Sequence, residues 1–194
     1  MKNKKRSAAP TSDLIENELK RVKYRENYAH TLKSTVFALI TVAASAILIA
    51  TLILPVFQIY GNSMTPTLKD GELIISVKGV NVGHGDIIAF YYNNKILVKR
   101  VIATSGEWVD IDEEGNVSVN SEPVDEPYIE EKAFGECNIE LPYQVPEGRV
   151  FVMGDHRSVS IDSRNTSVGC IAEEQIIGRL SLRFWPFESI GIVS

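Results

Sequence analysis

The pattern of apolar and polar positions divides the chain into three parts. Residues 34–68 carry no charged side chain, and residues 36–57 are almost wholly apolar. Because a helix needs about 20 apolar residues to cross a bilayer, we predict a membrane-spanning helix over residues 34–58. A cleavable signal sequence is the alternative, but this apolar run is longer than a typical signal core and lies behind a charged segment. Residues 1–33 and 59–194 are mixed in polarity and flank the predicted span.

A second helix is predicted before the apolar run. Residues 11–13, Thr-Ser-Asp, suit the start of a helix that continues toward Lys33. This helix can join the predicted span without a break. Pro55 lies near the outer end of the span, where proline readily ends a helix.

Short apolar stretches separated by turn residues follow the predicted span. They predict strands over residues 72–77, 86–91, 95–99, 107–111, 117–119, 149–153 and 176–185. Asn93-Asn94 and residues 113–116 predict hairpin turns, and residues 121–147, rich in Pro and Glu, predict an irregular insertion. The fold class is therefore mainly β, an all-β domain of barrel or sandwich type preceded by one transmembrane helix.

The charge distribution predicts an orientation in the membrane. Residues 1–33 hold nine Lys or Arg and four Asp or Glu, whereas the rest of the chain holds eleven and twenty-one. Since basic segments stay on the cytoplasmic side, we expect residues 1–33 to be cytoplasmic and residues 59–194 to be extracytoplasmic. An acidic domain also argues against binding of nucleic acid, which requires a basic face.

The two cysteines and the histidines of the outer domain give no metal site. Cys137 and Cys170 lack the paired spacing of zinc ligands, and only His84 and His156 accompany them outside the membrane. We therefore expect no metal. A disulfide can persist in an extracytoplasmic domain, but the sequence leaves open whether the two cysteines meet.

A candidate nucleophile, Ser63, lies directly after the apolar run, in residues 61–68. A serine hydroxyl needs a neighbouring base to become reactive. Nothing near His84 or His156 supports a Ser-His-Asp triad. Lys99 lies on a predicted strand where Leu97, Lys99, Val101 and Ala103 share one face. Burial there would lower the pKa of its amine and make it a base; the alternative is a lysine at a sheet edge or in a salt bridge.

A block of polar residues after Gly154 offers support for such a lysine. Ser160, Asp162 and Arg164 recur at every second position, so in an extended segment they would share one face. Ser160 could then hydrogen-bond to the Lys99 amine, with Asp162 and Arg164 paired behind it. The alternative is a polar loop that contains an Asp–Arg ion pair.

Together these three blocks resemble the bacterial type I signal peptidases. Residues 61–68 resemble the segment of the nucleophile, residues 98–102 the general-base motif, and residues 160–164 the family's Ser-x-Asp-Ser-Arg. The resemblance implies a membrane-anchored serine endopeptidase with a Ser63/Lys99 dyad and Ser160, Asp162 and Arg164 as supports of the base. It implies cleavage of signal peptides from exported preproteins after small residues, with no cofactor.

The chain departs from the family pattern at His156, where the family usually has asparagine. A second departure concerns the oxyanion. The resemblance makes the Ser63 backbone N–H one donor, but some members add a hydroxyl two residues earlier, where this chain has Gly61. Glycine there is typical of Gram-positive-like members. The second donor stays open between backbone, water and Asn62.

The expected partners are preproteins and membrane lipid, with a monomeric enzyme. Residues 184–187, Phe-Trp-Pro-Phe, add aromatic groups that favour a membrane interface, although strand core explains them equally well. Two rival functions are another Ser/Lys protease of similar fold and a tethered binding domain without activity. A self-cleaving repressor would need a DNA-binding module where this chain has an apolar span.

The charge distribution gives a prediction of topology. Protease added outside intact protoplasts should degrade residues 59–194 and leave residues 1–33 protected, because the basic segment stays inside. Immunoblots against tags at the two ends check this. Protection of the C-terminal domain would contradict the orientation.

Overall fold

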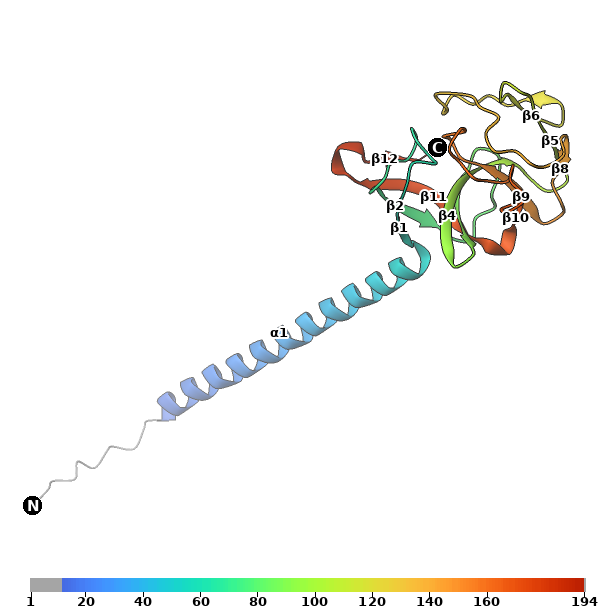
Figure 1. Cartoon of the computed structure of the whole chain (residues 1–194). Coiled ribbons are helices and arrows are strands. Elements are labelled where there is room, and N and C mark those ends of the chain that lie inside the picture. Colours follow the sequence, from blue (N-terminus) through green and yellow to red (C-terminus); the bar gives the residue numbers. More distant parts are fainter. Residues whose placement is uncertain (1–11, 194) are drawn as a thin grey trace, which may run out of the picture. The chain divides into compact units, whose positions relative to one another are not determined.

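The computed structural model describes residues 12–193, in two units that divide between Ile49 and Ala50. One long helix precedes a domain of antiparallel strands (Figure 1). The predicted fold class, mainly β with one N-terminal apolar helix, is confirmed. The part of the predicted segment 1–33 that precedes residue 12 lies outside the described residues.

The helix α1 runs without interruption over Ser12–Ile53. The two helices predicted on either side of Lys33 are therefore one. Residues Ile15–Thr51 are long and apolar enough to cross a membrane. The helix ends before Pro55 because proline has no N–H to donate and disfavours helical backbone at the residue before it. The predicted outer bound at residue 58 is therefore wrong, since residues 56–58 form a strand.

Antiparallel strands make two sheets. The larger has the order β1-β2-β11-β3-β4-β9-β10, and β12 pairs with β11. Its strands are β1 (Val56–Gln58), β2 (Leu73–Val77), β3 (Ile87–Tyr92), β4 (Lys95–Ala103), β9 (Arg149–Met153), β10 (Ile171–Ala172), β11 (Ile176–Trp185) and β12 (Gly191–Ile192). The smaller sheet has the order β7-β6-β5-β8. Its strands are β5 (Trp108–Ile111), β6 (Val117–Val119), β7 (Glu122–Pro123) and β8 (Tyr143–Gln144).

All seven predicted strands are present, with bounds shifted by a few residues. The hairpin at Asn93-Asn94 is confirmed, and both residues have the positive φ, 43° and 60°, that such a turn requires. The short strands β1, β7, β8, β10 and β12 were not predicted, because two or three residues give too little alternation to recognise. Two short 3₁₀ helices, Glu173–Gln175 and Phe187–Ser189, flank β11.

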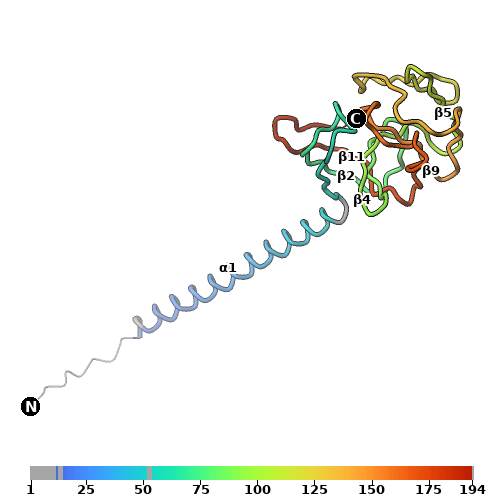
Figure 2. The backbone as a smooth tube through the Cα atoms, in the orientation of Figure 1, coloured from blue at the N-terminus to red at the C-terminus, as the bar shows by residue number. Residues whose placement is uncertain are grey.

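Strand β4 passes through the centre of the larger sheet and carries Lys99 in its middle. It pairs with β3 on one side and β9 on the other. Figure 2 labels β4 and β9 on the backbone. Leu97 and Val101 pack in the same apolar cluster, as predicted, but Ala103 packs in another. A register shift between Val101 and Ala103 is the reason, since a bulge interrupts the alternation of side chains.

The domain holds three apolar clusters that fix the elements around β4. One joins the end of β4 to the smaller sheet through Ile102, Val109 and Phe151. Another places Met64 and Leu68, from the loop after β1, against Ile74 and Leu180. This second cluster anchors the loop that carries Ser63.

Candidate active site

Ser63 and Lys99 meet in the structure. The Lys99 Nζ atom lies 2.7 Å from the Ser63 Oγ atom. Ser63 lies in a turn after β1, and that turn is tied down on both sides of the serine. Gly61 N–H donates to Asp70 Oδ1 at 2.7 Å, and Met64, 2% exposed, is buried in the core. The two residues singled out as nucleophile and base are therefore within hydrogen-bond distance.

Burial brings the pKa of the Lys99 amine closer to neutral pH. The residue is only 4% exposed, and loss of hydration lowers its pKa to about 8. Asp162 and Asp155 favour the charged form and oppose this shift, while Arg164 reinforces it. With a pKa about 8, about a tenth of the amine is neutral at pH 7. A neutral amine at 2.7 Å can take the proton of the serine hydroxyl.

Residues 160–164 form an irregular turn, so the polar loop considered as the alternative is what the structure has. Ser160, Asp162 and Arg164 are all buried, but Ser163 is buried as well, and of these five residues Ile161 alone is exposed. The turn therefore buries four polar side chains and does not keep the alternation of a strand.

Asp162 and Arg164 form the expected ion pair. The Arg164 Nε donates to Asp162 Oδ1 at 2.8 Å, and Nη2 donates to Oδ2 at 2.9 Å. Gly154 N–H also donates to Asp162 Oδ2 at 3.0 Å. Arg164 further donates to the carbonyls of Phe134 and Arg157. The pair therefore holds the turn closed, and it acts on Lys99 through charge.

The predicted hydrogen bond from Ser160 to Lys99 is absent. Among the described residues the buried Ser160 hydroxyl has no partner. Its Oγ lies against Gly154, at a place that a Cβ on residue 154 would fill. The same missing Cβ leaves room for the Ser63 carbonyl. Ser160 therefore packs beside the backbone of Ser63, and glycine is required at residue 154 to let these groups approach.

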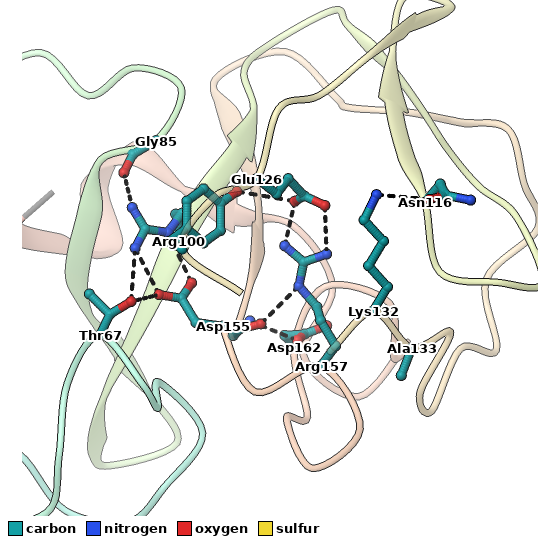
Figure 3. Close-up of polar contacts among 12 residues, drawn as sticks. Thr67, Gly85, Arg100, Asn116, Glu126, Lys132, Ala133, Asp155, Arg157 and Asp162 are labelled. Carbon is teal, nitrogen blue, oxygen red and sulfur yellow. Dashed lines mark hydrogen bonds and ion pairs between the residues drawn. The ribbon is translucent and has the colours of Figure 1, made fainter. Parts of the chain in front are cut away.

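Two further buried ion pairs hold the loop after β9 through Asp155 and Arg157, and sequence reasoning missed both (Figure 3). Arg100 donates to Asp155 at 2.9 and 2.7 Å, and its guanidinium lies 3.7 Å from the centre of the Tyr128 ring. Arg157 donates to Glu126 at 3.1 and 2.5 Å. An arginine inside an apolar strand was a visible signal at Arg100, but its partner lies 55 residues away.

A groove runs along the candidate pair. Its volume is about 590 Å³, and one side of it is the start of β4. Its lining comprises residues 57–61, Ser63, Met64 and residues 94–99. The Ser63 and Lys99 side chains lie in a wall that is otherwise largely apolar. A chain laid in this groove would pass the serine hydroxyl.

The cysteines and the acidic groups of the described residues form neither a disulfide nor a metal site. Cys137 and Cys170 are free thiols, and burial raises the pKa of Cys170 to about 11. Within residues 12–193, no three His, Cys, Asp or Glu side chains are placed to hold a metal ion.

Comparisons with known proteins show the family of the chain. A family model described as "Signal peptidase, peptidase S26" matches residues 30–185. Signal peptidase IB of Staphylococcus aureus is 37% identical over 68% of this chain and 78% of its own length. Signal peptidase I of Bacillus amyloliquefaciens is 35% identical over 79% of this chain and 85% of its own.

A solved structure of a signal peptidase I from Enterococcus faecalis is also similar. It covers 53% of this chain and 98% of its own, with 26% identity and a TM-score of 0.45. The sequence relatives define the class of protein, a peptidase that hydrolyses peptide bonds. The chain belongs to the signal peptidase family S26, as the resemblance implied.

The buried pair gives a prediction of stability. Asp162→Asn or Arg164→Ala leaves a partner charge buried and unpaired, so each should lower the free energy of unfolding by about 3–5 kcal/mol. Denaturant unfolding followed by circular dichroism measures this. Arg21→Ala, which breaks an exposed ion pair on α1, is the control and should change little. Wild-type stability in both buried variants would contradict a supporting role.

The pKa of Lys99 gives a prediction of pH dependence. Because only the neutral amine can accept a proton, kcat/KM should rise with pH and level off above a pKa of about 8. The pH profile of peptide cleavage by the purified enzyme checks this. A rise centred near about 6.5 would indicate a histidine base instead.

Proposed function

We propose that the chain is a membrane-bound serine endopeptidase that removes signal peptides from exported preproteins by a Ser63/Lys99 mechanism. The observation that carries the proposal is the 2.7 Å contact between Lys99 Nζ and Ser63 Oγ, made by a lysine that is buried. The family supports the substrate class, because the relatives are named signal peptidases.

The proposed reaction begins with proton transfer from Ser63 Oγ to neutral Lys99 Nζ as the oxygen attacks the scissile carbonyl carbon. The Ser63 backbone N–H, the donor implied by the resemblance, stabilises the resulting oxyanion. The Lys99 ammonium then donates its proton to the leaving amine. Neutral Lys99 Nζ then takes a proton from a water molecule whose oxygen attacks the acyl carbon. As the bond between that carbon and Ser63 Oγ breaks, the proton passes from Lys99 to Ser63 Oγ.

The groove beside Ser63 is the proposed site for the residues before the cut. It combines apolar side chains with the exposed backbone at the start of β4. An extended peptide placed there can add backbone hydrogen bonds to a strand while its side chains enter apolar pockets. Cleavage after small residues is the specificity that the resemblance implies, and the apolar groove is consistent with it.

A bilayer is the proposed setting of the enzyme. The helix α1 ends at Ile53 and β1 begins at Val56. Two intervening residues span at most about 7 Å, so a membrane-spanning α1 keeps β1 close to the bilayer surface. The basic segment 1–33 supports a cytoplasmic N-terminus and an extracytoplasmic catalytic domain.

The outer face of the larger sheet supports contact with lipid. Val56 pairs with Ile75, Ile75 pairs with Leu182, and Leu182 pairs with Ile192, which is 81% exposed. Ile74, on the opposite face, is buried in the core. An apolar row on the solvent side of a sheet is unusual for a soluble surface, and it begins three residues after α1. Trp185 and Phe187 pack edge to face, 4.8 Å apart, close to this row in the sequence.

The rival functions make different demands on the site. A tethered binding domain has no need of a buried lysine against a serine hydroxyl, because burying an amine is costly. Ser63 and Lys99 both come from one chain, so a monomer suffices for the proposed reaction.

Replacement of the two residues tests the proposal. Ser63→Ala and Lys99→Ala should each reduce kcat/KM for a labelled preprotein by at least about 10²–10⁴-fold, with normal thermal melts. The double variant should lose little more, because the two side chains act as one unit. Lys78→Ala removes an exposed lysine and serves as the matched control. Retention of more than about a tenth of the rate in Lys99→Ala would exclude Lys99 as the base.

A further inference from the structure

His156 makes three contacts with the turn that carries Ser63. Its backbone N–H donates to the Ser63 carbonyl at 3.1 Å. Its Nδ1 atom lies 3.0 Å from Thr65 Oγ1 and 3.3 Å from the Asn62 carbonyl oxygen. The imidazole therefore reaches the residue before the serine and the residue two positions after it.

The hydrogen bonds around Thr65 decide which ring nitrogen of His156 carries a proton. The Thr65 hydroxyl has one proton and donates it to the Asn62 carbonyl at 2.9 Å. Thr65 Oγ1 can then only accept from His156, and the Asn62 carbonyl can only accept as well. Nδ1 is therefore the donor to both.

We propose that His156 is a positioning residue for the nucleophile. It acts through its Nδ1–H, which bridges the two flanks of the Ser63 turn, and this role rests on the proposed function of Ser63. Asp70 and the apolar core anchor the two ends of the turn, but Ser63 itself lies outside any regular element and follows Gly61, whose φ is +84°, so the brace that His156 provides adds a constraint between these anchors. A reacting atom displaced by about 1 Å can cost about 10²-fold in rate, so loosening the turn lowers kcat without removing a group that contacts substrate.

The geometry predicts which residues can replace His156. In asparagine the amide nitrogen is attached to Cγ, as Nδ1 is in histidine, so His156→Asn keeps a donor at the same distance from the backbone. Glutamine carries the same amide one methylene farther out. Asparagine should therefore restore the brace and glutamine should not.

The brace should not depend on the charge of the ring. Nδ1 keeps its proton whether or not Nε2 is protonated. The charged neighbours on the same loop are already paired, Asp155 with Arg100 and Arg157 with Glu126, and Lys99 is bonded to Ser63. The pH at which the rate rises should therefore be the same with histidine or asparagine at residue 156.

Steady-state cleavage of a labelled preprotein by the full-length enzyme tests the proposal. His156→Ala should lower kcat roughly 10- to 100-fold, on the scale expected for a misplaced nucleophile, and change KM far less. His156→Asn should recover most of kcat with an unchanged pH profile, and His156→Gln should stay low. His84→Ala, which removes an imidazole bonded to Glu107 instead, is the matched control and should leave kcat unchanged.

Three results would overturn the proposal. They are wild-type kcat in His156→Ala, equal kcat in the Asn and Gln variants, and a pH profile that shifts in His156→Asn. If His156→Ala has a lowered melting temperature, the comparison of kcat between His156→Asn and His156→Gln tests the proposal instead, since both variants keep a polar amide. Ser63→Ala, measured alongside, separates the proposed function from the role of His156. Cleavage by Ser63→Ala would refute Ser63 as the nucleophile. An inactive Ser63→Ala together with wild-type kcat in His156→Ala would refute only the positioning role of His156.

Discussion

The structure depends on an amine placed where water cannot solvate it. Lys99 is buried on a central strand and contacts Ser63. Burial of a charged amine is costly, so the protein can keep Lys99 only by allowing it to lose its proton or by balancing its charge. The site does both, because desolvation lowers the pKa of Lys99 while Asp162 and Asp155 partly offset that shift. A pKa about 8 results, which leaves a usable fraction of the neutral base near neutral pH.

The buried carboxylates that act on Lys99 require partners of their own. Arg164 pairs with Asp162 and Arg100 pairs with Asp155, so neither carboxylate is left unpaired. Ion pairs of this kind add little net stability, but removing one partner is expensive. Their arginines also bond backbone carbonyls, as Arg164 does at Phe134. The same ion pairs therefore set the charge around Lys99 and fix the loop that packs against the Ser63 turn.

Sequence reasoning identified what is local or periodic. The strands, the Asn93-Asn94 hairpin and the candidate pair Ser63 and Lys99 all came from patterns of a few residues or from the resemblance. Sequence reasoning failed where a feature depends on contacts between residues that are far apart in the sequence. The bulge after Val101 arises from pairing with β9, and the orientation of the Ser160 hydroxyl depends on Gly154. The partner of Arg100 lies 55 residues away, beyond the reach of any local pattern.

The central claim is that burial lowers the pKa of Lys99 far enough for its amine to act as a base, and this amine can be observed directly. NMR titration of the enzyme with ¹³C-labelled lysine side chains, with Lys99→Arg used to assign the signal, gives the pKa of this one group without substrate. We expect one lysine, absent from the spectrum of Lys99→Arg, to titrate at a pKa of about 8. A Lys99 signal that titrates near the ordinary value of about 10.4 would contradict the account.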